Sequence, residues 1–162
     1  MVVQHMPPIF TRTYAESLAK ICSFEVKEAQ DGDKVVPGRC LIAPGDFHME
    51  LARSGIVLKA SLHQKPPLHS VRPAADYLMK TVARQLGPQA IGIVLTGMGK
   101  DGAEGLLEMR KAGAYTIAQD EKSSIVYGMP KAAADCGAVM QVASLEEISS
   151  YLASALNKNA AA

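Results

Sequence analysis

Two kinds of apolar pattern alternate along the chain. Short apolar runs predict β-strands, whereas apolar residues repeated at three- and four-residue spacing predict α-helices. The expected strands are residues 24–29, 39–43, 48–52, 55–60, 90–95, 115–118 and 138–142. Helices are expected from residue 13, over 73–86, up to 112, over 130–136 and from 144 onward. This alternation of strands and helices favours an α/β fold.

The character of individual strands refines that prediction. Residues 90–95 are apolar on both faces, which is typical of a strand buried inside a parallel sheet. Residues 48–60 alternate between apolar and polar and predict a β-hairpin. We therefore predict a doubly wound, mainly parallel sheet with helices on both faces and a β-hairpin insertion. One domain is expected over residues 1–157, followed by a frayed tail at residues 158–162.

Two helix starts carry a capping-box pattern, in which a hydroxyl residue precedes a glutamate by three positions. Thr13 precedes Glu16, and Ser144 precedes Glu147. We expect one helix to begin after Thr13 and another after Ser144.

Composition and charge exclude several classes of protein. The 17 basic and 16 acidic residues nearly cancel, which argues against broad nucleic-acid binding. No apolar run approaches the length of a membrane span. The 3 cysteines are widely spaced and fit neither a zinc site nor a disulfide framework. We expect a cytoplasmic protein with reduced thiols that binds no nucleic acid and does not insert into a membrane.

Candidate chemistry lies in two loops, each directly after a predicted strand. Residues 95–102 read Leu-Thr-Gly-Met-Gly-Lys-Asp-Gly and connect the apolar strand to a helix. His5 follows the short apolar pair Val2-Val3. Because parallel strands end at one edge of a sheet, we expect both loops at that edge. A histidine and an aspartate so placed are two of the three members of a hydrolytic triad.

The same residues have other interpretations. Asp101 could cap the following helix, and His5 could be an ordinary loop histidine. The spacing Gly97-x-Gly99-x-x-Gly102 superficially matches a nucleotide-binding loop, which makes a nucleotide-binding α/β domain an alternative function. That alternative needs Asp120 or Glu121 to bind the ribose, whereas the simpler role of this acidic pair is to cap the turn at residues 122–124.

Other polar residues give weaker signals. Arg72, beside Pro73, could bind an acidic substrate or be a surface charge. His48, His63 and His69 include no pair at helical i, i+4 spacing and no cysteine partner. We therefore predict neither a metal site nor a cofactor.

Several motifs occur together along the chain. They are Val3-Gln4-His5-Met6-Pro7, Ile42-Ala43-Pro44-Gly45, Arg72-Pro73 with Asp76, Leu95-Thr96-Gly97-Met98-Gly99 with Asp101-Gly102-Ala103 and Gly105-Leu106, Ala118-Gln119-Asp120-Glu121, and Tyr127-Gly128-Met129-Pro130. In this combination and order, the chain resembles the catalytic domain of the CheB-type protein-glutamate methylesterases of bacterial chemotaxis. The resemblance covers nearly the whole chain.

The resemblance implies a function and a site. It implies hydrolysis of glutamate methyl esters, and deamidation of glutamines, on the methylated cytoplasmic helices of chemoreceptors, without a cofactor. It implies that His5 is the triad base and that Asp101 orients it. Met98 would lie in the loop lining the site, where its backbone would help to stabilise the oxyanion.

The chain also departs from the family pattern. The family's nucleophilic serine lies in a Gly-x-Ser-x-Gly-Gly segment before the histidine motif, and no serine here has that setting. We therefore assign no nucleophile and expect an N-terminally truncated catalytic domain, poorly stable and nearly inactive alone. A receiver domain would act in cis or in trans. Ala74-Ala75 also replaces the Ser-Val that often follows Arg-Pro. A catalytically inactive receptor-binding module is the alternative from another class of function.

Overall fold

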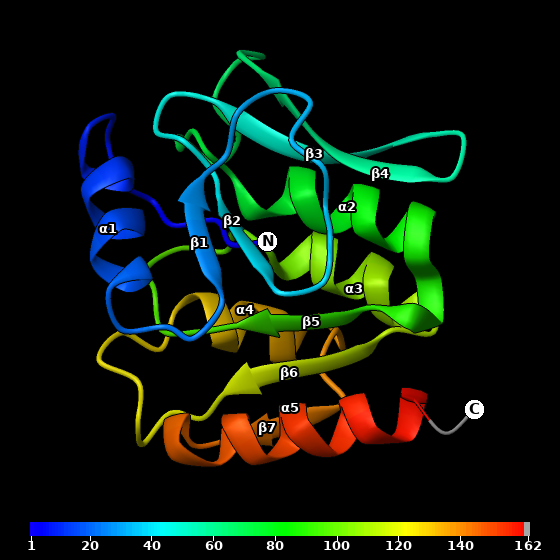
Figure 1. The fold of residues 1–162 in the computed structure, drawn as a ribbon. Helices are drawn as coiled ribbons and strands as arrows, with labels where there is room; N and C mark the ends of the chain where they lie inside the picture. The colour runs from blue at the N-terminus through cyan, green and yellow to red at the C-terminus, as the bar shows by residue number, and fades with distance from the viewer. Residues whose placement is uncertain (161–162) are drawn as a thin grey trace. The chain divides into compact units, whose positions relative to one another are not determined.

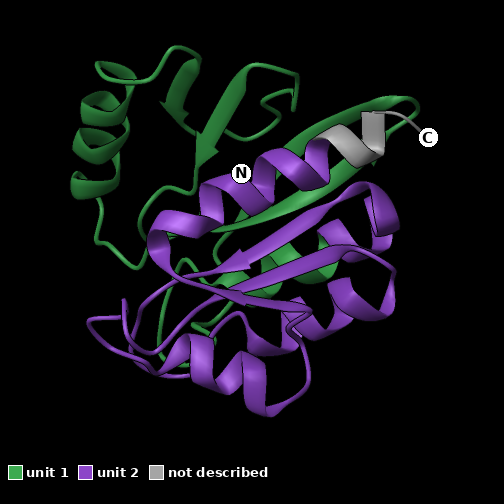
Figure 2. Ribbon diagram, turned by 90° about the horizontal axis from the view of Figure 1, so that it is seen from below, with its two compact units in different colours: residues 1–81 green, residues 82–162 purple. Residues whose placement is uncertain are grey.

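The computed structural model describes residues 1–160 (Figure 1). It divides into two compact units, Met1–Thr81 (unit 1) and Val82–Ala162 (unit 2), shown in different colours in Figure 2. Within the described residues, no helix has both the length and the apolar character needed to cross a membrane.

Unit 1 contains a small parallel sheet covered by a helix. Strands β1 (Glu25–Glu28) and β2 (Arg39–Ile42) pair in parallel, and α1 (Phe10–Ala19) packs against them. Val2 extends the pairing, because its N–H donates to the Leu41 carbonyl at 2.8 Å. The short apolar pair before His5 is thus an isolated bridge to β2 rather than a full strand.

Unit 1 also contains the predicted β-hairpin. Strands β3 (His48–Ser54) and β4 (Val57–His63) are antiparallel, and each is longer than the alternating pattern indicates. Gly55, with φ of 60°, lies in the two-residue turn that joins them. Helix α2 (Ala75–Leu86) follows and runs from unit 1 into unit 2. It begins two residues later than Pro73, and the N–H of Ala74, directly before the helix, donates to His48 Nδ1 at 3.1 Å.

Unit 2 is a three-layered α/β unit. Strands β5 (Ile91–Val94), β6 (Tyr115–Gln119) and β7 (Gln141–Ala143) form a parallel sheet in that order. Figure 2 shows α5 (Leu145–Ala160) on one face, with α3 (Ala103–Lys111) and α4 (Met129–Asp135) on the other. The alternation within β5 explains this layering. Ile91 and Ile93 pack in the cluster that contains Ile148 of α5.

Gly92, between those isoleucines, faces the opposite layer. A Cβ atom at this position would lie 2.6 Å from Leu106 Cδ1 and 2.9 Å from Met109 Sδ, so α3 packs directly on the backbone of β5. The predicted parallel sheet with helices on both faces is therefore confirmed in unit 2, and the predicted hairpin is confirmed in unit 1. The described strands form three separate sheets, β1–β2, β3–β4 and β5–β6–β7.

The two capping boxes have different outcomes. The Ser144 hydroxyl donates to Glu147 Oε2 at 2.8 Å, and α5 begins at the next residue, as predicted. The Thr13 prediction is wrong, since α1 already begins at Phe10 and the Thr13 hydroxyl donates back to the Ile9 carbonyl. Helix α5 also includes residues 158–160 of the predicted tail, and residues 161–162 lie outside the described residues.

Candidate active site

His5 lies in a tight loop directly after the Val2 bridge. The Met6 N–H donates to the Gln4 carbonyl at 2.8 Å, which makes a three-residue γ-turn centred on His5. The side chain of His5 is exposed. The loop therefore holds its backbone in a defined turn while presenting the imidazole outward.

The residues after His5 rest on Gly45. A Cβ atom at Gly45 would lie 2.8 Å from Pro8 Cα and still closer to the peptide bond between Pro7 and Pro8. Only glycine leaves room for that contact. The Gly45 N–H also donates to the buried Thr11 hydroxyl at 3.0 Å. The two-proline loop is thus packed against a fixed stretch of backbone.

An open hollow lies beside this loop in unit 1. It is lined by His5, Met6, Pro7, Val71 and Arg72. Arg72 therefore lies next to His5, where a substrate-binding residue was expected. Its guanidinium donates to Asp46 Oδ1 at 3.0 and 2.5 Å, and to the Gln64 and Lys65 carbonyls at 3.2 and 3.1 Å. These bonds fix Arg72 as part of the wall.

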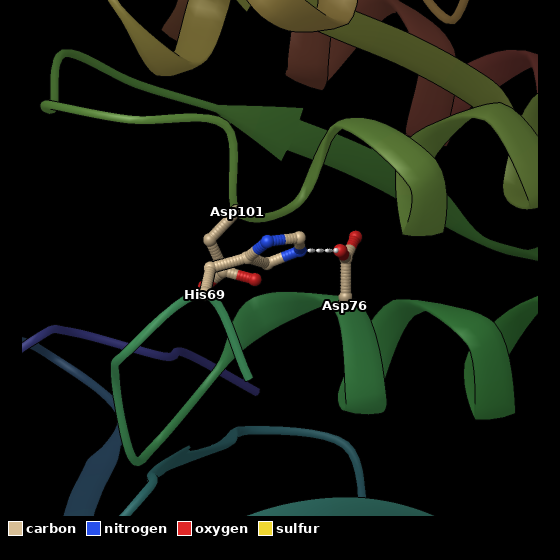
Figure 3. Close-up of side chains that lie close together, drawn as sticks. All are labelled: His69, Asp76 and Asp101. Carbon is tan, nitrogen blue, oxygen red and sulfur yellow. Dashed lines mark hydrogen bonds and ion pairs between the residues drawn. The ribbon is translucent and has the colours of Figure 1, made fainter. Parts of the chain in front are cut away.

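A second histidine in unit 1 has a carboxylate partner that sequence analysis missed. His69 Nε2 donates to Asp76 Oδ2 at 2.8 Å (Figure 3). The Asp76 side chain, in the first turn of α2, is fully buried. No periodic signal links a loop histidine to a helical aspartate seven positions later, although Asp76 does belong to the Arg72-Pro73 motif.

Asp101 lies in unit 2, in the loop between β5 and α3. The N-cap position of α3 is occupied by Gly102, whose φ is 84°, rather than by Asp101. The Asp101 residue is only 2% exposed. His5 belongs to the other unit, unit 1. The pairing of Asp101 with His5 stays a prediction.

The base of the Asp101 loop is fixed by Gln119, a buried residue that sequence analysis did not single out. Gln119 Oε1 accepts the Thr96 N–H at 2.8 Å, and its Nε2 donates to the Ser123 carbonyl at 2.8 Å. The Thr96 hydroxyl in turn accepts the Val126 N–H at 2.9 Å. The loop that follows β5 is therefore tied to the loop that follows β6.

Two glycines complete this contact between loops. The Gly97 carbonyl accepts the N–H groups of Gly128 and Met129 at 3.1 and 2.8 Å. A Cβ atom on Gly128 would lie 2.7 Å from that carbonyl oxygen. Met98 is held between Gly97 and Gly99 with 85% of its surface exposed.

These contacts bear on the nucleotide-binding alternative. A phosphate cradle needs backbone N–H groups that point at the ligand. Here the Thr96 N–H donates to Gln119 and the Gly97 N–H donates to the Val126 carbonyl at 3.0 Å. Asp120 Oδ1 meanwhile accepts from the Ser123 hydroxyl and N–H at 2.6 and 2.9 Å, which confirms the turn-capping role. The loops are bonded to each other, and this arrangement does not favour a nucleotide.

Replacing Gln119 with leucine should lower the free energy of unfolding of the chain by about 1–3 kcal/mol. The change removes an acceptor and a donor from a buried position and leaves their backbone partners unpaired. Denaturant titration measures the loss, and Gln141→Leu, which removes an exposed bond to the neighbouring Val142 carbonyl, should lose less. Equal losses in both variants would contradict the assigned role of Gln119.

Hydrogen bonds from the Ser123 hydroxyl and N–H hold the pKa of Asp120 below its ordinary value of 3.8. The stabilisation from these bonds is therefore present above that pH and is lost as the pH falls through the lowered pKa. Ser123→Ala should raise the pKa of Asp120 toward the ordinary value in a carbon-13 NMR titration. Ser124→Ala is the matched control, because Ser124 donates to the Asp120 backbone carbonyl and not to the carboxylate. An unchanged pKa in Ser123→Ala would show that the hydroxyl is not the cause.

Comparison with known proteins gives a consistent result. Residues 1–152 match the family described as CheB methylesterase. The chain is 62% identical over 162 residues to a Bdellovibrio bacteriovorus protein named protein-glutamate methylesterase/protein-glutamine glutaminase, covering 100% of this chain and 46% of that protein. A Salmonella typhimurium protein of the same name is 51% identical over 152 residues, covering 94% of this chain and 44% of that protein. The chain thus spans less than half the length of these curated relatives.

The fold agrees with the sequence comparison. The crystal structure of the Thermotoga maritima CheB methylesterase catalytic domain matches with a TM-score of 0.90 and 38% identity, covering 93% of this chain and 80% of that chain. The family match extends over the segments that carry His5, Met98 and Asp101. The chain belongs to the CheB methylesterase family.

Proposed function

We propose that this chain is the histidine- and aspartate-bearing part of a cytoplasmic enzyme that hydrolyses glutamate methyl esters, and deamidates glutamines, on chemoreceptor helices. The observation that carries the proposal is the presentation of His5. It is exposed, its γ-turn is anchored to β2 and backed by Gly45, and it borders an open hollow. Family membership adds the reaction class. No cofactor is needed for this chemistry.

The proposed mechanism uses a serine from outside these residues. His5 accepts the proton of the serine hydroxyl, and the serine oxygen attacks the ester carbonyl carbon. The protonated His5 then gives its proton to the ester's methoxy oxygen, or to the amide nitrogen when the substrate is glutamine, and methanol or ammonia leaves as the bond to the carbonyl carbon breaks. Water, deprotonated by His5, cleaves the acyl-enzyme and regenerates the serine.

Other residues take supporting roles in this proposal. Asp101 accepts the second ring N–H of His5 and keeps the imidazole in one tautomer. The backbone at Met98 donates toward the oxyanion. Arg72, whose guanidinium is bonded to Asp46 and two carbonyls, shapes the hollow beside the substrate.

The test is methanol release from a methylated chemoreceptor fragment. The active species would be a chimera in which this chain replaces the matching 162 residues of the Bdellovibrio bacteriovorus protein. Release by the chimera, with little from the chain alone, is the expected result. A chimera that binds the fragment but releases no methanol would instead support the binding-module alternative.

A further inference from the structure

The segment between His69 and Asp76 is a loop closed by its own side chains. The 2.8 Å bond from His69 Nε2 to Asp76 Oδ2 joins a turn to the first turn of α2 (Figure 3). Because Asp76 is fully buried on a helix, it is a rigid anchor for the imidazole. The bond therefore fixes the position of the turn relative to α2.

The turn itself adopts a conformation that its residues disfavour. Leu68 and Val71 exchange two backbone hydrogen bonds of 3.1 and 3.0 Å, so His69 and Ser70 are its central residues. Their φ values are 53° and 64°, both in the left-handed region. Such a turn prefers asparagine followed by glycine. A histidine kept there at a local cost indicates a role for its side chain.

The closed loop carries part of the wall of the hollow beside His5. Val71 and Arg72 line that hollow, and they lie between the two bonded residues in sequence. Val71 is bonded directly to the turn, and Arg72 is bonded to Asp46. The imidazole–carboxylate bond thus restrains two of the five lining residues.

We propose that His69 is a positioning residue, which through its bond to Asp76 sets the Val71–Arg72 wall of the hollow that receives the substrate side chain. This inference rests on the proposed ester hydrolysis and adds a specificity element to it. A wall that only holds the substrate acts equally on the ground state and the transition state. Its loss therefore raises KM and leaves kcat nearly unchanged.

The first experiment uses NMR on the full 162-residue chain. His69→Asn removes the reach to Asp76 while placing in the turn a residue that tolerates left-handed φ. We expect shifts in the Val71 methyl signals and the His5 imidazole signals, with the signals of β6 and β7 unchanged. Ser70→Asn is the matched control, since it alters the same turn and leaves the bond in place. The single variant Asp76→Asn keeps a side-chain oxygen that can accept the His69 N–H. Its Val71 signals should therefore match those of the wild type.

A second variant separates loss of the bond from loss of stability. His69→Asn leaves a buried carboxylate without this partner, which alone can be destabilising. The double variant His69→Asn/Asp76→Asn removes the charge together with the bond and should give the same Val71 and His5 shifts. Wild-type signals in this double variant would overturn the proposal.

The second experiment measures methyl-ester hydrolysis in the chimera. His69→Asn should lower kcat/KM by up to about 10²-fold, the loss lying in KM with kcat within about twofold. A fall in kcat alone would overturn the positioning role. If the wild-type chimera releases no methanol while the NMR shifts occur as expected, the proposed function fails and the His69–Asp76 restraint on the hollow stands.

Discussion

His5→Gln should lower kcat of the chimera for methanol release by about 10⁶-fold, because loss of the base leaves the serine hydroxyl protonated during attack. Asp101→Asn should lower kcat less, by about 10⁴-fold, since the imidazole remains but its tautomer is no longer fixed. Substrate affinity should change little in either variant. Methanol release under saturating methylated fragment measures both losses.

The ratio of these losses separates two roles of Asp101. If Asp101 only stabilises the start of α3, Asp101→Asn should leave both thermal stability and kcat near the wild-type values, because asparagine serves a helix start about as well as aspartate. If it orients His5, kcat falls and the combined variant is no worse than His5→Gln alone, because residues that act as one unit are not additive. His63→Gln, in the β3–β4 hairpin, is a matched control expected to retain activity.

Gly45→Ala should lower kcat/KM by about 10²-fold and destabilise unit 1 by about 1–3 kcal/mol. The added methyl group would overlap the Pro7–Pro8 backbone, so the loop that carries His5 must move. Steady-state kinetics and denaturant titration measure the two effects. The reacting groups themselves are untouched, so His5 chemistry is altered only through position.

Gly38→Ala is the matched control for this prediction. A methyl group at Gly38 meets nothing within 4 Å, and its φ of 75° imposes only backbone strain. That variant should lose about 1–2 kcal/mol of stability and keep its kcat/KM. Full activity in Gly45→Ala would mean that the Pro7–Pro8 loop can shift without moving His5.

Those parts of the fold that depend on local pattern could be predicted from sequence. The apolar run at 90–95 gives β5, the Ser144–Glu147 box begins α5, and the turn after Asp120 closes as expected. Thr13 misled because a threonine inside a helix can bond back to an earlier carbonyl and so imitates a cap in the sequence.

Those parts of the site that depend on tertiary contact could not be predicted. His5 and the loop of Asp101 follow from their places after apolar segments. The bond of Gln119 to Thr96 joins loops after two different strands, and the bond of His69 to Asp76 needs a left-handed turn. Neither has a periodic signature, since the partners meet only once the chain is folded.

Exposure of Met98 makes the loop after β5 a chemically vulnerable part of the molecule. Oxidants convert an accessible thioether to a polar sulfoxide, whereas Met49 and Met109, at 0% and 2% exposure, are shielded in the interior. A preparation aged in air would lose the apolar surface of this loop while its melting behaviour stayed normal. A normal melting curve therefore does not establish that the site loop is intact, and activity should be measured on freshly prepared protein.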